Sequence, residues 1–309
     1  MEKLNSKNLR GNWATLLLPI QADNSIDFKL LEDEIDRLIA AGVDGIYSNG
    51  TAGEFHNQNE REFDQINQLL AEKCKQSQMR FQIGASHPSP WISLERLKRT
   101  VVLQPDAFQV ILPDWVAASA DEQITFLQGM ETGADGIPLV LYNPPHAKTK
   151  LAPIDYQKFE QSVPSLIGVK LLSKDVAWAA EMKEFANYLS VFVPGHFLAS
   201  GVKVGIASGA YSNVACINPT AAQKLWNLMH QDIEEALRIE QNILEFFRIC
   251  IAPYQQKGYS NPALDKFLAA VGGAIQIPNR LRWPYKWISE NDVAGARKVA
   301  KSLIPEFFN

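Results

Sequence analysis

Apolar runs of strand length alternate with helix-like segments along most of the chain. Eight segments are typical of strands, at residues 12–20, a short stretch closed by Tyr47, 80–86, 107–112, 139–143, 166–172, 190–195 and 205–213. Each is followed by a helix-like segment, at 27–41, 59–76, 91–102, 120–131, 153–162, 175–187, 197–203 and 219–229. This alternation predicts an α/β fold with a parallel sheet.

Eight such units predict a closed (β/α)8 barrel, which we place at residues 1–230. Residues 231–309 are expected to form a C-terminal helical extension of three helices appended to the barrel. A doubly wound sheet is the alternative architecture. It is less favoured because no Gly-x-Gly-x-x-Gly motif follows the first strand.

One amine interrupts the apolar run at 166–172, namely that of Lys170. A strand of this composition is usually covered on both faces, where an unpaired ammonium is costly. At its usual pKa of about 10.4, roughly one lysine amine in 2500 is neutral at pH 7. A dry pocket lowers that pKa and allows attack on a ketone to form a Schiff base. A strand-end lysine that reaches solvent fits the same segment.

Two other strand ends carry candidate chemistry, because active sites of barrels lie at the C-terminal ends of strands. The turn 50–54, Gly-Thr-Ala-Gly-Glu, has two glycines whose backbone amides could approach a carboxylate, although an ordinary glycine-containing turn has the same composition. Tyr142 ends the fifth strand before Pro144 and Pro145, where its hydroxyl could shuttle a proton or simply complete the packing.

Charge and cysteine content narrow the possible partners. The net charge of −4, the pI of about 5.8 and the lack of a basic block argue against nucleic acid. No apolar run reaches the length of a membrane span, and residues 1–10 are polar rather than signal-like, so neither membrane nor export is expected. Three widely spaced cysteines suit a reducing cytoplasm. No His-x-His or His-Glu-x-x-His spacing predicts a metal site.

Taken together, these motifs resemble the dihydrodipicolinate synthase / N-acetylneuraminate lyase family. The resemblance is carried by the turn 50–54, Tyr142, the segment 168–170, Asn261-Pro262 and the segment 281–284. It implies a (β/α)8 barrel with a C-terminal helical extension, commonly a homotetramer. It also implies metal-independent and cofactor-free Schiff-base chemistry on pyruvate or another 2-oxo acid.

The resemblance also implies roles for individual residues. Lys170 would be the Schiff-base lysine and Tyr142 the proton relay. The turn that begins at Gly50 would bind the 2-oxo acid carboxylate, through Thr51 and the amide of Ala52. Tyr211 would lie on the loop after the eighth strand that closes the pocket.

Three positions depart from the family pattern. Ala52 replaces a hydroxyl residue and removes a hydrogen bond of about 0.5–1.5 kcal/mol. Ala147 stands where the synthases carry an arginine for aspartate semialdehyde, and Trp115 stands where they use a second tyrosine across a subunit interface. These departures argue against dihydrodipicolinate synthesis.

Other side chains are expected on the catalytic face. The histidines of four loops that follow strands are His56, His87, His146 and His196. With Lys148 they could bind a hydroxylated or acidic sugar-acid chain, although exposed loop histidines fit the same pattern. Trp115 is a candidate pocket wall.

The predicted function is therefore a Schiff-base lyase, aldolase or dehydratase acting on pyruvate or a 2-keto-3-deoxy sugar acid, as a homo-oligomer (dimer or tetramer). A true dihydrodipicolinate synthase is one alternative, which Ala147 disfavours. A non-catalytic member that binds 2-oxo acids is another, which Lys170 disfavours.

Overall fold

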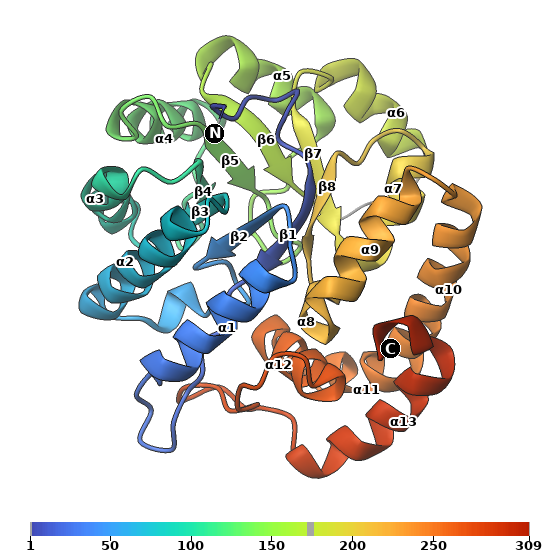
Figure 1. The fold of residues 1–309 in the computed structure, drawn as a ribbon. Coiled ribbons are helices and arrows are strands. Elements are labelled where there is room, and N and C mark those ends of the chain that lie inside the picture. Colours follow the sequence, from blue (N-terminus) through green and yellow to red (C-terminus); the bar gives the residue numbers. More distant parts are fainter. Residues whose placement is uncertain (1, 172–175, 309) are drawn as a thin grey trace.

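Eight parallel strands close into a barrel in the computed structural model, which describes residues 2–171 and 176–308 (Figure 1). The strands are β1 Gly11–Thr15, β2 Gly45–Ser48, β3 Phe81–Gly84, β4 Ala107–Ile111, β5 Leu139–Tyr142, β6 Leu166–Lys170, β7 Ser190–Pro194 and β8 Gly209–Ser212. They pair in sequence order, and β8 pairs with β1 to close the sheet. The predicted (β/α)8 barrel is confirmed.

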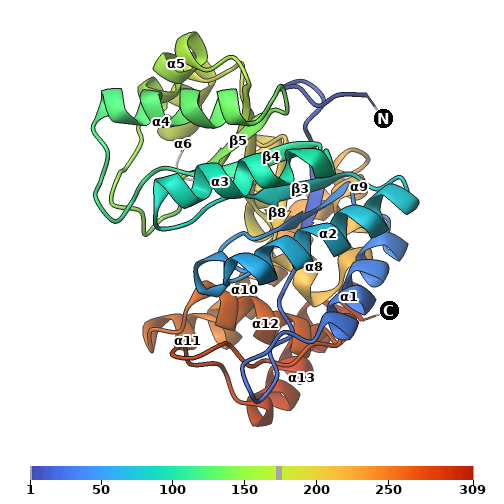
Figure 2. The same ribbon diagram turned by 90° about the vertical axis from the view of Figure 1, so that its left-hand side faces the viewer.

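Helices follow the strands and surround the barrel (Figures 1 and 2). They are α1 Phe28–Ala40, α2 Glu60–Gln76, α3 Pro90–Thr100, α4 Ala120–Gly133, α5 Pro153–Ser162, α6 Val176–Phe185, α7 Leu198–Lys203, α8 Val214–Ile217 and α9 Pro219–Met229. Short 3-10 turns are η1 Phe55–Asn57, η2 Val101–Leu103, η3 Gly195–Phe197, η4 Glu290–Asp292 and η5 Pro305–Phe307. Capping boxes at Asn59 and Ser119 fix the starts of α2 and α4.

The first and eighth strands are much shorter than predicted. The first ends at Thr15, because the amide of Leu17 donates to a carboxylate oxygen of Glu34 on α1 (2.9 Å) instead of continuing the ladder. The eighth begins only at Gly209, because the preceding residues turn back on α7, with the amides of Ile206 and Ala207 donating to a carbonyl of that helix. Leu172 and Asp175, the predicted ends of a strand and a helix, lie outside the described residues.

The C-terminal extension has four α-helices in the described part of the chain rather than three. They are α10 Ile233–Cys250, α11 Ala252–Gln256, α12 Asn261–Gly272 and α13 Val293–Leu303. Pro253 separates α11 from α10, since proline lacks the amide that a continuous helix needs. These helices lie together on one side of the barrel, orange to red in Figures 1 and 2, and α12 packs against α8. The division at residue 230 stays a prediction.

Large aromatic side chains fill the barrel interior. Trp13, Tyr47, Phe192 and Tyr211 are buried in one cluster with aliphatic neighbours. Gly45 makes room for it, because a Cβ there would lie 2.5 Å from the ring of Trp13. The barrel is therefore a packed core rather than a channel, and any ligand must bind above this aromatic layer.

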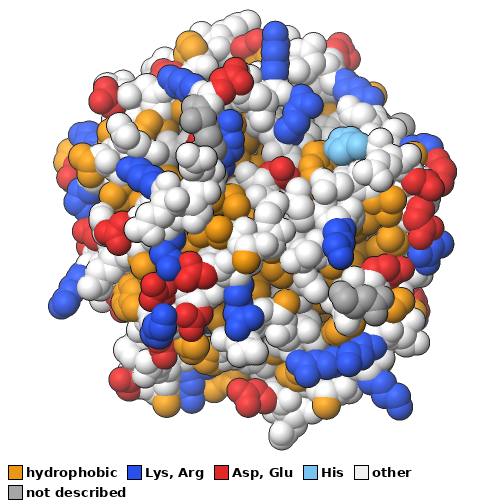
Figure 3. All heavy atoms as spheres, viewed as in Figure 1, with side chains coloured by type: hydrophobic (Ala, Val, Ile, Leu, Met, Phe, Trp, Pro, Cys, Tyr) orange, Lys and Arg blue, Asp and Glu red, His pale blue; other side chains and the backbone are white. Residues whose placement is uncertain are grey.

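The surface in Figure 3 shows basic and acidic side chains interspersed rather than gathered by sign. Within residues 2–171 and 176–308, no helix has both the length and the apolar character needed to cross a membrane.

A buried ion pair ties the extension to the barrel. The Lys266 amine on α12 donates to a carboxylate oxygen of Glu54, in the loop after β2, at 2.6 Å, and both side chains are almost fully buried. The second carboxylate oxygen of Glu54 accepts from the backbone amide of Arg282 (3.3 Å). The amine of Lys266 also donates to the carbonyl of Arg280 (2.7 Å), so neither charge depends on water.

We predict that Lys266→Met lowers the free energy of unfolding by about 3–5 kcal/mol, because it leaves the Glu54 carboxylate buried without its cation. The Glu54→Gln/Lys266→Met double variant should be much closer to the parent chain, since no buried charge remains. Urea denaturation measures both. Lys29→Met, which removes an exposed pair with Glu32, should leave the midpoint unchanged. Equal losses in the single and double variants would contradict the prediction.

Candidate active site

A cavity of about 500 Å³ opens at the C-terminal ends of the strands. The residues from the strands and their loops that line it are Thr15, Tyr47, Thr51, Ala52, Tyr142, Pro145, His146, Lys170, Leu171, Pro194, His196, Tyr211 and Asn213. Those from the extension are Phe247, Ile251, Gln255, Asn261, Leu264, Asp265 and Leu268. Seven of the ten predicted site residues therefore share one cavity.

The Lys170 amine lies among three tyrosine rings. Its Nζ is 4.2 Å from the ring centre of Tyr142, 5.0 Å from that of Tyr47 and 5.3 Å from that of Tyr211. It donates one long hydrogen bond, of 3.3 Å, to the hydroxyl of Tyr47. Burial lowers the pKa of Lys170 to about 8, and the negative charge of Asp265 partly opposes this.

Tyr142 is the register partner of Lys170, because β5 and β6 are neighbours. Burial raises the pKa of Tyr142 to about 12, and the nearby Thr51 hydroxyl partly offsets the rise. The Thr51 oxygen is buried and has no partner in good hydrogen-bond geometry among the described residues. A hydroxyl in this position is available to a ligand.

The turn after β2 is held in an unusual backbone conformation. Asn49 and Glu54, at its two ends, have φ values of 53° and 51°, in the left-handed region that most residues avoid. The Asn49 amide donates to Asn67 of α2 (2.9 Å), and Glu54 is held by its ion pair. Gly50 does not line the cavity. It packs on the Tyr47 ring, where a Cβ would approach to 2.6 Å.

Tyr211 lies in β8 itself, not on a loop that closes the pocket, so that prediction is corrected. Its side chain is buried because it belongs to the aromatic layer inside the barrel. Its hydroxyl donates to the Gln82 side-chain oxygen (2.5 Å). Tyr211 therefore contributes to the floor of the cavity.

The four loop histidines separate into two groups. His146 and His196 line the cavity, and the Nδ1 of His196 lies 3.1 Å from the side-chain oxygen of Asn213. Burial lowers the pKa of His196 to about 4, so its ring is neutral at physiological pH. His56 and His87 do not line the cavity. The His56 ring packs on Tyr285, and His87 accepts a hydrogen bond from a backbone amide of its own loop.

Trp115 and Lys148 are also outside the cavity lining, contrary to prediction. The Trp115 side chain is 81% exposed, and the Lys148 amine donates to the Trp115 carbonyl (2.7 Å) and lies over its ring. The Lys148 backbone amide donates to Asp114 (2.6 Å). These contacts join the loops after β4 and β5 to each other and hold both side chains away from Lys170.

A model of the dihydrodipicolinate synthetase family matches residues 8–301. The chain belongs to this family. An uncharacterised DapA-like lyase from Pyrococcus abyssi is 27% identical over 250 residues, 78% of this chain and 82% of the relative. An N-acetylneuraminate lyase from Escherichia coli is 25% identical over 209 residues, 65% of this chain and 69% of the relative. The predicted family is confirmed, and the predicted class of enzyme agrees with these names.

A solved structure supports the fold independently. YagE, a prophage protein of E. coli K12 described as a member of the dihydrodipicolinic acid synthase family and crystallised with pyruvate, superposes with a TM-score of 0.83. The match covers 96% of this chain and 99% of YagE at 20% sequence identity.

Sequence reasoning missed the contribution of the C-terminal extension to this family member's cavity. Asn261, Leu264, Asp265 and Leu268 recur at helical spacing along one face of α12 and line the cavity. A signal was present, since Asp265 and Lys266 are the adjacent charges of an otherwise apolar helix. Nothing in the sequence, however, specified that this helix lies over the mouth of the barrel.

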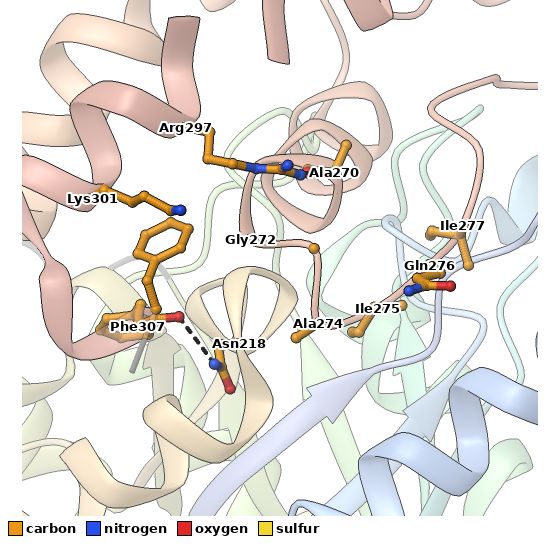
Figure 4. A pocket seen from close by; sticks show the side chains of 12 residues that line it. Asn218, Ala270, Gly272, Ala274, Ile275, Gln276, Ile277, Arg297, Lys301 and Phe307 are labelled. Carbon is orange, nitrogen blue, oxygen red and sulfur yellow. Dashed lines mark hydrogen bonds between the residues drawn. The ribbon is translucent and has the colours of Figure 1, made fainter. Parts of the chain in front are cut away.

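A second hollow, of about 760 Å³, lies beside α12 and α13 (Figure 4). Arg297 donates there to the last carbonyls of α12, and Asn218 donates to the carbonyl of Phe307 (3.0 Å). These polar groups therefore satisfy the last carbonyls of α12 and hold η5 near the C-terminus. In the described part of the chain, no group of three or more histidine, cysteine or acidic side chains is placed to hold a metal.

Proposed function

We propose that the chain is a Schiff-base-forming lyase that acts on a 2-oxo acid, with Lys170 as the nucleophile. The observation that carries the proposal is the enclosed Lys170 amine at the end of β6, whose pKa burial lowers to about 8. At pH 7 about one such amine in ten is neutral, against about one in 2500 for an ordinary lysine. A non-catalytic binding protein has no use for an amine kept in this state.

The substrate carboxylate would be held by the turn after β2. Thr51 and Ala52 both line the cavity beside Tyr142, and the buried Thr51 hydroxyl has no partner in good hydrogen-bond geometry among the described residues. This places the carboxylate near the amine that attacks the adjacent ketone. The pyruvate complex of YagE supports a 2-oxo acid as the ligand of this fold.

The chemistry follows from these positions. The neutral amine of Lys170 adds to the ketone carbon, and the resulting hydroxyl takes up a proton and leaves as water, forming an iminium. With a 2-keto-3-deoxy acid, the bond between the third and fourth carbons then breaks and its electron pair enters the iminium. The proton of the 4-hydroxyl passes through Tyr142 to the third carbon, after which water releases pyruvate. Dehydration of the same substrates would share the imine.

The remainder of the substrate would be hydroxylated rather than acidic. Lys170 is the only lysine or arginine among the described lining residues, and in the proposed reaction its amine binds the ketone carbon. Ala147 is buried and offers no charge to a second carboxylate. Amide and imidazole groups suited to hydroxyls are present instead, on His196, Asn213 and Gln255. This composition favours 2-keto-3-deoxy sugar acids over aspartate semialdehyde.

The proposal also includes assembly as a homo-oligomer, dimer or tetramer, as the family resemblance implies. A cytoplasmic location suits the three cysteines, each a free and buried thiol.

We predict that pyruvate with cyanoborohydride adds one reduced pyruvyl group to the peptide containing Lys170. The rate should rise with pH up to about 8, because only the neutral amine attacks. Mass spectrometry of intact and digested protein measures both. Lys170→Ala should abolish the adduct, whereas Lys148→Ala, outside the cavity, should keep it. An undiminished adduct in Lys170→Ala would refute the role of Lys170.

Tyr142→Phe should lower turnover by about 10²–10⁴-fold, the usual contribution of a general acid–base group. The fold should be retained, since a single hydroxyl is lost, and circular dichroism checks this. Tyr259→Phe, which removes a hydroxyl outside the cavity, serves as the matched control. Near-normal turnover in Tyr142→Phe would exclude it as the proton relay.

Cleavage or dehydration of 2-keto-3-deoxy sugar acids should be faster than condensation of pyruvate with aspartate semialdehyde. The reason is the missing arginine at Ala147, since bidentate charged hydrogen bonds are the strong ones. The measurement compares kcat/KM for the two substrate classes on one preparation. A preference for aspartate semialdehyde of about tenfold or more would show that another group binds the second carboxylate.

A further inference from the structure

Asp265 is the only acidic side chain among the described residues that line the cavity. It belongs to the cavity-facing stripe of α12, between Leu264 and Lys266 in the sequence. Lys266 points away to its ion pair with Glu54. That pair fixes the rotation of α12, so the preceding side chain, Asp265, is directed into the cavity.

The Asp265 carboxylate is not tied to another group by a hydrogen bond or a salt bridge in the described residues, although it lies in the same cavity as Lys170. Burial raises the pKa of Asp265 to about 7, and the charge of Lys170 opposes this rise. Asp265 in turn raises the pKa of Lys170 against the effect of burial. The two groups thus share the protons available near neutral pH.

Other titratable groups surround this pair. They are Tyr47 from β2, Tyr142 from β5, Tyr211 from β8, Cys216 from α8 and His196 from η3, together with His146 of the loop after β5. Burial raises the pKa of all three tyrosines and of Cys216 and lowers that of His196. No second acidic side chain lines the cavity in the described residues. The negative charge that balances a charged Lys170 therefore comes from Asp265 or from the substrate.

We propose that Asp265 is the counter-ion of the iminium formed on Lys170 and the source of the proton that its formation consumes. This inference rests on the proposed Schiff-base function. It assigns a catalytic contribution to the C-terminal extension rather than to the barrel.

The proton balance supports this role. A neutral amine and a ketone require one proton to give an iminium and water. When the shared proton of the pair resides on Asp265, Lys170 is free to attack, and the carboxylic acid then supplies the proton that leaves with the water. The products are an iminium cation and a carboxylate anion within one dry cavity, where their attraction is strong. Hydrolysis of the iminium returns the proton by the reverse steps.

The test uses Asp265→Asn, which removes the charge and nearly preserves the shape. Trapping of pyruvate by cyanoborohydride is followed across pH by mass spectrometry. The midpoint of the rising limb of the pH–rate profile should move to lower pH, because the anion that raises the pKa of Lys170 is gone. The maximum rate should nevertheless fall by about 10²-fold, the lower end of a general acid's contribution, because Asp265 can donate a proton only while it is protonated, near neutral pH. A merely structural role would not shift the midpoint.

Two further variants complete the design. Asp265→Glu should restore most of the maximum rate. Glu34→Gln is the matched control, since Glu34 is a buried carboxyl, with its pKa raised by burial to about 8, that lies outside the cavity. It should leave the midpoint unchanged. If Asp265→Asn does not fold, Asp265→Leu continues the apolar stripe of α12 and takes its place with the same expectation.

An Asp265→Asn profile that matches the parent chain in midpoint and maximum rate would overturn the inference while leaving Lys170 as the nucleophile. Failure of the parent chain itself to trap pyruvate would instead overturn the proposed function, and the inference with it.

Discussion

The ion pair between Glu54 and Lys266 is the contact on which the geometry of the cavity depends. It joins the loop after β2, which carries Thr51, to α12, which carries Asp265. Both charges are buried, so their separation would be strongly unfavourable. One wall of the cavity belongs to the barrel and the opposite wall to the extension. The pair holds these two walls in a fixed relative position. A small rotation of α12 would move Asp265 away from Lys170.

Lys170 illustrates how a destabilising feature becomes useful chemistry. The packed aromatic layer inside the barrel excludes water from below, and the tyrosine rings surround the amine from the sides. Burial therefore lowers the pKa of the amine, while the same rings tolerate its charged form through cation–π contacts. At pH 7 about one amine in ten is therefore neutral, so the charged form is stored and the neutral form remains accessible. A nucleophile that must be charged in one step and neutral in the next benefits from that balance.

The sequence predicted the features that depend on residues close to one another along the chain. The alternation of apolar runs was sufficient for the barrel, and Lys170 stood out as the one charge in a buried strand. Tyr142 followed from its place at a strand end. The position of Asp265 depends on packing between segments about two hundred residues apart, which no periodicity encodes. The same limit explains Trp115 and Lys148, whose loops follow the right strands but bind each other outside the cavity. Tyr211 was assigned to a loop by the family resemblance, although it lies within the strand predicted at 205–213.

The few charged side chains in the cavity limit which substrates it can accept. Lys170 is the one lysine or arginine and Asp265 the one acidic side chain among the described residues that line the cavity. A substrate that brings a single carboxylate to the turn after β2 meets hydroxyl and amide groups there. A second carboxylate near α12 would meet the anion of Asp265 and no free cation. The position of α12, fixed by the Glu54 ion pair, thus supplies both the partner of Lys170 and a reason for the cavity to prefer neutral, hydroxylated chains beyond the 2-oxo acid.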